Sequence, residues 1–404
     1  MKNLLIGQSG GPTAVINSSL AGAVSCGLNS SHFEKVFGTV NGVEGILKEN
    51  FISMDKFRDE KLLNLLKQTP SSYLGSCRKK LPTLDENEQI YEEIFSIFEK
   101  HNIGTFAYIG GNDSMDTVLK LSKYAKEKNI DIKIAGIPKT IDNDLVLTDH
   151  TPGYGSAAKF IANSVKQLSM DSRVYDLKSV LVVEIMGRNA GWLTAAAALS
   201  NTENERFADI IALPETPFLP DSLISETEKI LKEKNTVIIA LSEGIKDKNG
   251  MYMGESINSL RAGQDSFNHA ILGGVGRTVE SLISASLGVK TRTVELSTLQ
   301  RSASFAASSC DVEEAFRAGF FGVTFATEGK TGFMAGFKRI SDQPYSMEIV
   351  PFDIEKVANF EKKMPAEMIN GFDVTEKFIN YAKPLIFGEP DISYTNGIID
   401  FVIR

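Results

Sequence analysis

Short apolar runs rich in β-branched residues alternate along most of the chain with longer segments in which apolar residues recur every three or four positions. The first pattern is typical of buried strands and the second of amphipathic helices. Residues 89–101 illustrate the second pattern, because Ile90, Ile94 and Phe98 fall on one face of a helix. The alternation of the two patterns is the main structural signal in this sequence.

This pattern predicts a series of strand and helix units. The predicted strands are residues 4–7, 105–109, 132–137, 179–185, 210–213, 236–241 and 291–296. The predicted helices are residues 14–26, 89–101, 113–126, 156–168, 190–199, 220–232 and 267–287. The last hundred residues are less regular, and there we expect helices over 353–363, stopped by Pro365, and over 374–383.

Strands that alternate with helices predict an α/β fold, in which helices cover parallel sheets. About eight such units exceed one comfortable sheet, and 404 residues at about 150 per domain suggest two or three domains. We therefore expect two α/β domains. The turns rich in glycine and proline follow predicted strands, and open α/β sheets bind ligands at the carboxyl ends of their strands.

Composition and charge exclude several classes of protein. The formal charge of −8 argues against a general nucleic-acid binder, which carries a basic surplus. The apolar run at the N-terminus is too short for a signal peptide, and no stretch approaches the ~18 apolar residues of a membrane span. Cys26, Cys77 and Cys310 have no metal-finger spacing, and three cysteines favour a reducing cytosol. We expect a cytoplasmic protein without a membrane or nucleic-acid partner.

Two glycine-rich turns join a predicted strand to a predicted helix. The first, Gly-Gln-Ser-Gly-Gly-Pro-Thr at 7–13, would let backbone N–H groups approach an anion at a helix N-terminus. The second, Gly-Gly-Asn-Asp-Ser at 110–114, offers Asn112, Asp113 and Ser114 either as a helix N-cap or as oxygen ligands facing a phosphate–magnesium complex. A tight packing turn explains either segment alone, but two such turns favour a phosphate site.

A third segment, Pro-Lys-Thr-Ile-Asp-Asn-Asp at 138–144, gathers short polar side chains at the end of a strand. An ordinary polar turn is one interpretation. In the functional interpretation, Asp142 accepts a proton, Thr140 donates to a phosphate and Lys139 neutralises the charge of the transferred group. Two further turns follow strands, Met-Gly-Arg at 186–188 and Ser-Glu-Gly at 242–244, and could bind phosphate and sugar hydroxyl groups.

Taken together and in this order, these segments resemble the phosphofructokinase family from Gly7 to Arg301. The resemblance implies two Rossmann-like, three-layer α/β domains with the active site between them. It also implies a glycolytic and gluconeogenic reaction that transfers a phosphoryl group to the 1-hydroxyl of fructose 6-phosphate, with Mg²⁺ as cofactor. The resemblance further implies a donor-binding domain formed by residues 1–145 and completed by part of 300–385. It implies a domain for fructose 6-phosphate at 146–299 and a C-terminal tail at 386–404.

Two positions indicate which phosphoryl donor the protein uses. Members that use ATP typically have glycine where this chain has Asp113 and Lys139, and members that use pyrophosphate resemble this chain at both positions. A carboxylate at Asp113 would repel a nucleotide α-phosphate, and Lys139 would add positive charge for a small inorganic donor. The resemblance therefore favours pyrophosphate, with fructose 1,6-bisphosphate and phosphate as products of a reversible reaction. An ATP-dependent member is the alternative.

The resemblance also assigns roles to individual residues. The catalytic set would be Asp142 as base with Lys139, Asp113 and Thr140; the donor site Gly10, Gly11, Arg78 and Ser114; and the metal site Asn112 and Asp113. The sugar-phosphate site would be Thr140, Ile141, Asp142, Met186, Gly187, Arg188, Glu243, Arg292, Thr298 and Arg301. Many members have aspartate where Asn112 stands, and histidine or tyrosine where Thr298 stands.

Arg292 matches a family arginine that reaches the 6-phosphate of a neighbouring subunit, which implies a homodimer or homotetramer with shared active sites. Two other classes fit less well. A sugar-phosphate-binding protein without activity has no need of the cluster at 140–144. A dinucleotide-dependent dehydrogenase requires a glycine spacing that neither glycine turn has.

Overall fold

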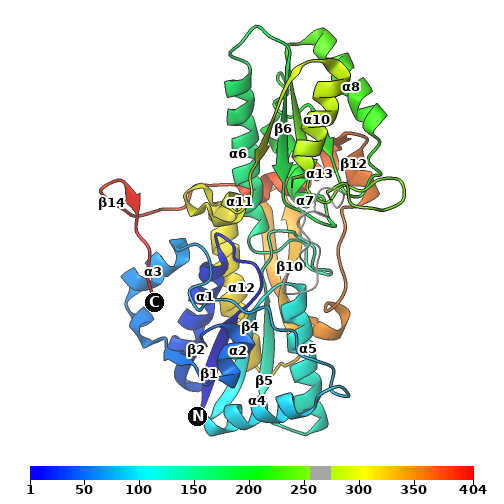
Figure 1. Ribbon diagram of the computed structural model, residues 1–404. Helices are drawn as coiled ribbons and strands as arrows, with labels where there is room; N and C mark the ends of the chain where they lie inside the picture. Colours follow the sequence, from blue (N-terminus) through cyan, green and yellow to red (C-terminus); the bar gives the residue numbers. More distant parts are fainter. Residues whose placement is uncertain (255–273) are drawn as a thin grey trace. The chain divides into compact units, whose positions relative to one another are not determined.

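The computed structural model describes residues 1–254 and 274–404, which form two compact units (Figure 1). Unit 1 consists of Met1–Ser156, Arg301–Glu361 and Phe387–Arg404, and unit 2 of Ala157–Gln300 and Lys362–Ile386. The chain passes between the units within helices α6 (Tyr154–Ser172) and α11 (Leu299–Ser302) and twice more near the C-terminus. Which ligand each unit binds stays a prediction.

Unit 1 is built on a seven-stranded sheet whose order is β11-β10-β5-β4-β1-β2-β3. The strands are β1 (Lys2–Gln8), β2 (Phe33–Thr39), β3 (Phe51–Ser53), β4 (Ile103–Gly110), β5 (Lys133–Pro138), β10 (Phe333–Asp342) and β11 (Tyr345–Asp353). The central pairs are parallel, while β3 and β11 are antiparallel to their neighbours. Parallel pairing aligns the ends of β1, β4 and β5, so the turns that follow them share one edge of the sheet.

Helices cover both faces of this sheet, which explains why its central strands are continuous apolar runs. Leu4 and Ile6 of β1 pack on one side with α1 and α12, and Leu5 packs on the other side with α4 and α5. The helical elements of unit 1 are α1 (Ile16–Asn29), α2 (Gly42–Leu47), α3 (Glu60–Gln68), α4 (Gln89–Lys100), α5 (Asn112–Glu127), α12 (Ser309–Thr327) and the 3₁₀ helices η1 (Asp55–Arg58), η3 (Ser304–Ala306) and η4 (Ile354–Lys356). A short hairpin, β14 (Tyr394–Thr395) and β15 (Ile398–Ile399), lies near the C-terminus.

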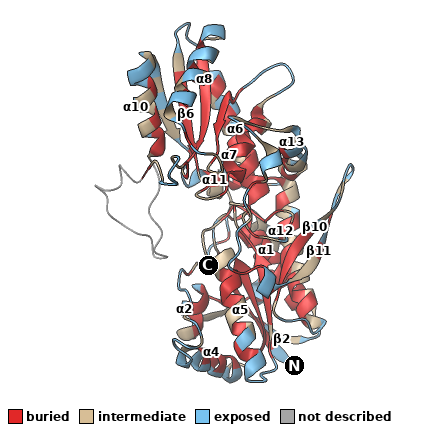
Figure 2. Cartoon of the chain, turned by 90° about the vertical axis from the view of Figure 1, so that its right-hand side faces the viewer, coloured by how far each residue is buried: buried red, intermediate tan, exposed pale blue. Residues whose placement is uncertain are grey.

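Unit 2 contains a four-stranded parallel sheet of order β7-β8-β6-β9. Its strands are β6 (Ser179–Ile185), β7 (Ile210–Ala212), β8 (Thr236–Ser242) and β9 (Lys290–Glu295). Its other elements are α7 (Trp192–Ala195), η2 (Ala196–Ser200), α8 (Pro220–Glu233), α10 (Val275–Leu287), η5 (Ala366–Met368), β12 (Ile369–Asn370), β13 (Asp373–Val374), α13 (Glu376–Ala382) and η6 (Lys383–Ile386). Figure 2 shows the inner strands largely in red, as buried, whereas the edge strand β9 contains no buried residue.

The α/β fold class is confirmed, and the predicted strands appear with ends shifted by a few residues. The predicted helix over 190–199 is a short α-helix followed by the 3₁₀ helix η2, and the helix over 374–383 begins later, at Glu376. The described part of the helix over 267–287 is α10, and residues 267–273 lie outside the described residues. No helix in the described ranges has the length and apolar character needed to cross a membrane.

The predicted helix over 353–363 is wrong. β11 extends to Asp353, and only the 3₁₀ helix η4 follows it. Asn359 has a left-handed backbone with φ of 68°, which interrupts a right-handed helix. Its side-chain amide also donates to the Asp116 carboxylate (2.9 Å), a tertiary contact that periodicity does not reveal.

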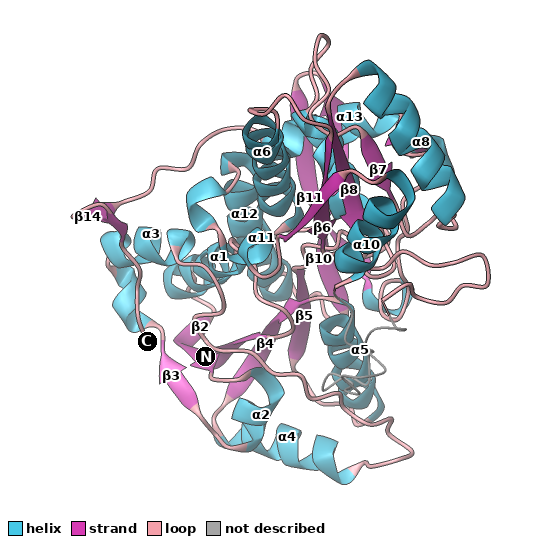
Figure 3. Cartoon of the chain, turned by 45° about the horizontal axis from the view of Figure 1, so that its top comes forward, coloured by secondary structure: helices cyan, strands magenta, loops and turns pink. Residues whose placement is uncertain are grey.

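Helices α1 and α12 pack backbone against backbone, and they lie side by side in Figures 1 and 3. A Cβ atom built on Gly22 would lie 1.9 Å from the carbonyl oxygen of Phe316, and one built on Gly319 would lie 1.9 Å from the carbonyl oxygen of Ser19. Because neither helix backbone can give way cheaply, both glycines are required by the close approach rather than by their conformation.

We expect Gly22→Ala to lower the free energy of unfolding by about 1–3 kcal/mol or more, since overpacking forces the helices apart. The measurement is urea denaturation followed by circular dichroism. Ser25→Ala, on the same helix but partly exposed, is the matched control and should change the free energy by less than about 0.5 kcal/mol. Equal effects of the two substitutions would contradict the close-packing explanation.

Candidate active site

The first glycine turn connects β1 to α1 and faces two cationic side chains of unit 1. A Cβ atom built on Gly10 would lie 3.2 Å from Lys139 Nζ, and one built on Gly11 would lie 3.2 Å from Arg301 Nη1. Gly10 also has a φ of 75°, in the region that favours glycine. The absence of a side chain at Gly10 and Gly11 therefore lets two positive charges lie beside this turn, which is a suitable arrangement for a polyanion.

Lys139 directly follows β5 and is almost completely buried, with 2% of its surface exposed. Its ammonium donates to the carbonyl oxygen of Gly11 (2.5 Å). Burial, together with the charge of Arg301, lowers the pKa of Lys139 to about 8, although Asp142 and Asp144 oppose the change. The sequence placed Lys139 and the glycine turn in one site, and the structure brings them into contact.

The Asp142 carboxylate lies in the same group of side chains. Thr140 Oγ1 accepts from the Asp142 amide (3.1 Å) and donates to Asp142 Oδ2 (3.3 Å). Burial raises the pKa of Asp142, and the Thr140 hydrogen bond and the charges of Lys139 and Arg301 partly oppose this shift. Ile141 between them is buried. A hydroxyl group, a carboxylate and an ammonium thus lie together at the end of β5.

The loop that carries Arg78 runs alongside the glycine turn. Ser76 Oγ donates to the carbonyl oxygen of Gly10 (2.6 Å), and Ser9 Oγ donates to the carbonyl oxygen of Cys77 (3.1 Å). Arg78 itself is exposed. These bonds place the guanidinium of Arg78 on a segment that is fixed to the turn.

The second glycine turn begins α5, and its polar residues have different surroundings. Asn112 donates to the carbonyl oxygen of Phe360 (2.7 Å) and accepts from the Asn359 amide (2.8 Å), so its side chain holds residues 359–360. Ser114 is buried against Gly110. The Asp113 carboxylate is 41% exposed and forms an ion pair with Lys80 (2.9 Å).

Lys80 is a residue whose partner the sequence did not reveal. Its neighbour Arg78 belongs to a recognisable motif, whereas Lys80 looks like part of a solvated edge. The ion pair with Asp113 brings it to the start of α5. A pairing of this kind depends on the path of the loop, and the only sequence signal is the proximity of Lys80 to Arg78.

The oxygen ligands available for Mg²⁺ are few. Within residues 1–254 and 274–404, no group of three or more histidine, cysteine, aspartate or glutamate side chains could hold a metal ion. Mg²⁺ commonly binds through one or two carboxylates together with substrate phosphates and water. The Asp113 carboxylate meets that requirement. Asn112 Oδ1 already accepts one hydrogen bond and retains a second lone pair.

In unit 2, the predicted sugar-binding segments lie together because they follow neighbouring strands, with Ile185 of β6 opposite Ser242 of β8. The Gly187 amide donates to Glu243 Oε1 (3.2 Å), and Ser242 Oγ donates to the carbonyl oxygen of Gly187 (2.6 Å). A Cβ atom built on Gly244 would lie 1.8 Å from the Arg188 carbonyl oxygen. The segments 186–188 and 242–244 therefore form one compact group.

Arg292 lies elsewhere in unit 2. It faces Leu181 in the register of β9 and β6, about five residues and roughly 16 Å from Met186 along the strand. It lines an open pocket of 320 Å³ with Tyr175 and Leu177. Thr298 is exposed in the turn after β9. The four residues 186–188 and 243 are thus brought together in unit 2, and Arg292 is not.

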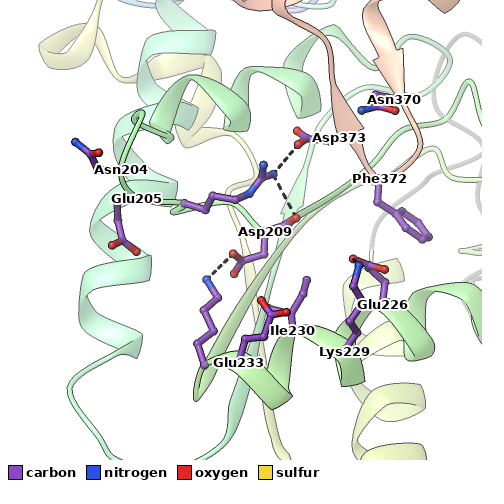
Figure 4. Close-up of a pocket in the computed structure, with 12 residues that line it drawn as sticks. Asn204, Glu205, Asp209, Glu226, Lys229, Ile230, Glu233, Asn370, Phe372 and Asp373 are labelled. Atoms are coloured by element: carbon purple, nitrogen blue, oxygen red, sulfur yellow. Dashed lines mark hydrogen bonds and ion pairs between the residues drawn. The ribbon is translucent and has the colours of Figure 1, made fainter.

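A larger pocket of 660 Å³ lies at another part of unit 2 (Figure 4). None of the residues predicted for the site lines it. Two ion pairs join its charged groups, Lys234 with Asp209 (2.5 Å) and Arg206 with Asp373 (2.7 Å). Because these charges satisfy one another, size alone does not make this pocket the better candidate.

Comparisons with known proteins identify the family of this chain. Residues 3–325 match the sequence model of the family described as Phosphofructokinase. The chain is 39% identical over 409 residues to a pyrophosphate–fructose 6-phosphate 1-phosphotransferase of Methylococcus capsulatus, covering 99% of this chain and 95% of the relative. A Xanthomonas campestris protein of the same name is 38% identical, with coverage of 99% and 95%.

A solved structure gives the same result for the fold. The crystal structure of a pyrophosphate-dependent phosphofructokinase from Nitrosospira multiformis superimposes with a TM-score of 0.90 at 35% identity. The match covers 99% of this chain and 96% of that chain. The resemblance noted in the sequence is therefore confirmed over nearly the whole length.

Proposed function

The chain belongs to the phosphofructokinase family, and we propose that it transfers a phosphoryl group from pyrophosphate to the 1-hydroxyl of fructose 6-phosphate. The products are fructose 1,6-bisphosphate and phosphate, and the reaction is reversible. The observation that carries the proposal is the buried Lys139 ammonium against the glycine turn, together with the Asp113 carboxylate at the start of α5. Three free cysteines support a cytoplasmic location.

On the donor side, the backbone of Gly10 and Gly11 and the guanidinium of Arg78 would bind pyrophosphate, with Ser114 at the start of α5. Lys139 supplies a charge that is already desolvated, which strengthens its attraction for a small anion. Asp113 disfavours the additional phosphate of a nucleotide by like charge. Mg²⁺, held by Asp113 and Asn112 with donor oxygens, would neutralise charge on the transferred group.

On the acceptor side, Asp142 takes the proton of the 1-hydroxyl as the phosphoryl group arrives. Thr140 orients the Asp142 carboxylate through its hydroxyl group. Lys139 balances the developing negative charge, and Ile141 borders the sugar phosphate. There is little covalent work for the protein in such a transfer, so positioning and charge neutralisation account for most of the rate.

The sugar phosphate would be bound by Met186, Gly187 and Arg188, with Glu243 accepting from sugar hydroxyl groups. Thr298 and Arg301 would approach the 6-phosphate. The distance of Arg292 from the group at 186–188 supports a role in a neighbouring copy of the chain, since its own site lies too far along the strand. A homodimer or homotetramer with shared sites follows from this assignment.

The donor assignment predicts turnover with pyrophosphate and Mg²⁺ and little turnover with ATP. Purified protein should convert fructose 6-phosphate with pyrophosphate and should also release fructose 6-phosphate from the bisphosphate in a phosphate-dependent reaction. A coupled spectrophotometric assay in both directions measures this. Robust activity with ATP alone would contradict the assignment, and binding without turnover would indicate a sugar-phosphate-binding protein.

Replacing the proposed base tests the mechanism. Asp142→Asn should lower kcat by at least ~10² because the amide cannot accept the proton. Circular dichroism should show that the fold is unchanged. Asp131→Asn, on an aspartate side chain that is 78% exposed, is the matched control and should leave kcat unchanged. Full activity of the Asp142 variant would remove this residue from the role of base.

The lowered pKa of Lys139 predicts a pH dependence of donor capture. The ammonium is charged below pH about 8 and loses its charge as the pH rises through that value. The value of kcat/KM for pyrophosphate reports the free enzyme and should therefore fall above pH 8. Lys139→Arg keeps a positive charge at all these pH values, so the fall should be absent in this variant. A fall that persists in the arginine variant would assign it to another group.

A further inference from the structure

A second cluster of charged side chains lies in unit 1, outside the residues used by the proposed reaction. His150 is at its centre, with 1% of its side chain exposed. Its Nδ1 lies 2.8 Å from Asp149 Oδ1, and its Nε2 lies 2.7 Å from Glu314 Oε2. Arg339 donates to the same Asp149 oxygen (2.9 Å), and the Tyr345 hydroxyl donates to Glu314 Oε1 (2.6 Å).

The geometry requires a charged imidazole. A neutral histidine has one N–H group, so one of the two carboxylate contacts would set lone pair against lone pair. Both ring nitrogens are donors only in the imidazolium form. Burial alone would lower the pKa of His150, but the two carboxylates outweigh it and raise the pKa to about 9.

The elements that pack around His150 contribute further titratable groups to this cluster. Helix α12 contributes Glu314, whose pKa is lowered despite burial, and also Cys310 and Asp311. Asp311 is held by the amides of residues 153 and 156. Strand β10 contributes Arg339. With His150 charged, two cations face the Asp149 and Glu314 carboxylates, so losing that proton leaves a buried negative charge without compensation.

The cluster fixes the segment that follows Asp142. The Asp149 amide donates to the carbonyl oxygen of Phe337 (2.8 Å), and the Phe337 amide donates to Thr148 Oγ1 (2.8 Å). The same hydroxyl donates to the His150 carbonyl oxygen (2.7 Å), and the His150 ring packs on Phe337 with centroids 4.7 Å apart. Residues 148–150 are therefore attached to β10 through both backbone and side chain.

The next residues carry this attachment to the reacting groups. Thr151 Oγ1 donates to the carbonyl oxygen of Thr140 (2.8 Å), and the Thr140 amide donates to the carbonyl oxygen of Pro152 (3.2 Å). Thr140 in turn bonds Asp142 through its hydroxyl group. Asp142 is thus connected to His150 through the hydrogen bonds of residue 140 with residues 151 and 152, which directly follow His150 in the chain.

We propose that His150, as a buried imidazolium between Asp149 and Glu314, is a positioning residue that holds Thr140 and Asp142 in place for phosphoryl transfer. The part of this proposal that concerns phosphoryl transfer rests on the proposed function. His150 itself touches neither substrate. Its pairing with Asp149 and Glu314 stabilises the segment fully below pH about 6.5, and this contribution is lost as the pH rises through about 9.

The first test is independent of activity. The protein has four histidines, and NMR of histidine labelled with ¹³C at Cε1 can follow each titration. His150→Gln assigns its signal by removing it. We expect His150 to titrate near pH 9, and titration at or below pH 7 would overturn the proposal.

The second test also needs no turnover. Hydrogen exchange of peptides covering residues 139–153 should be at least fivefold faster in His150→Gln than in the parent protein. His32→Gln, the same change at an exposed histidine, should leave exchange unchanged. Unchanged exchange in the folded His150 variant would overturn the proposal whatever reaction the protein catalyses.

The third test uses kinetics at 15 °C, where the variants remain folded by circular dichroism. His150→Gln should lower kcat at least tenfold and change the KM values for both substrates less than twofold. The parent protein should lose kcat above pH about 9, and the variant should lack this limb. The double variant His150→Gln, Glu314→Gln restores charge balance. Its kcat should be at least threefold higher than that of His150→Gln.

Two kinetic results would overturn the positioning role: a folded His150→Gln with the parent kcat, or a loss that follows only the unfolded fraction. If His150→Gln does not fold, Glu314→Gln alone is used instead, since it removes one of the two carboxylates. It should shift the His150 titration to lower pH and lower kcat, and failure of either change would overturn the proposal. Absence of turnover in the parent protein would count against the proposed function, and the exchange test would still decide the positioning role.

Discussion

The ammonium of Lys139 donates to the backbone of a glycine turn and is almost completely removed from water. Keeping a charge in that position requires compensation, which the carbonyl oxygen of Gly11 supplies by a hydrogen bond and the carboxylates of Asp142 and Asp144 supply by their charges. These oxygen atoms come from the ends of β1 and β5, which β4 separates in the sheet. The arrangement of the site thus depends on the alignment of parallel strands.

Unit 1 places buried charges in two groups with different properties. The charges of Lys139 and Arg301 both act on Asp142, and burial lowers the pKa of Lys139. The group around His150 is instead balanced within itself by paired carboxylates. The second group joins its charges through direct side-chain hydrogen bonds and is suited to holding backbone in place, whereas the first lies beside the glycine turn. Overall acidity of the chain says little about either group.

Much of the α/β fold could be predicted because the central strands are buried on both faces and form continuous apolar runs. β2 and α12 were not predicted, for physical reasons that differ. β2 exposes Glu34 and Lys35, so its pattern is that of a loop. Helix α12 has apolar residues and glycines on all sides, since it packs against both α1 and the sheet, and a residue pattern without a polar face gives no clear period.

The residues of the candidate site also divide into those that could be predicted from the sequence and those that could not. Segments such as 138–144 are local motifs, so Lys139, Thr140 and Asp142 could be found from the sequence. The partners of Asp113 and His150 lie far away in the chain, at Lys80 and Glu314. No local pattern reports such pairings, because they arise only when the sheet has brought distant segments together.

The close approach of α1 and α12 at Gly22 and Gly319 has a consequence for the order in which the protein acquires its structure during synthesis. Helix α12 completes the core beside α1, but it emerges from the ribosome only after most of unit 2 has been made. At roughly 5–20 residues per second, the roughly 170 residues between Ser156 and Thr327 take about 10–30 s to translate. Throughout that time the apolar face of β1 and α1 lacks its cover. The N-terminal segment of unit 1 therefore cannot complete its core until α12 has been made.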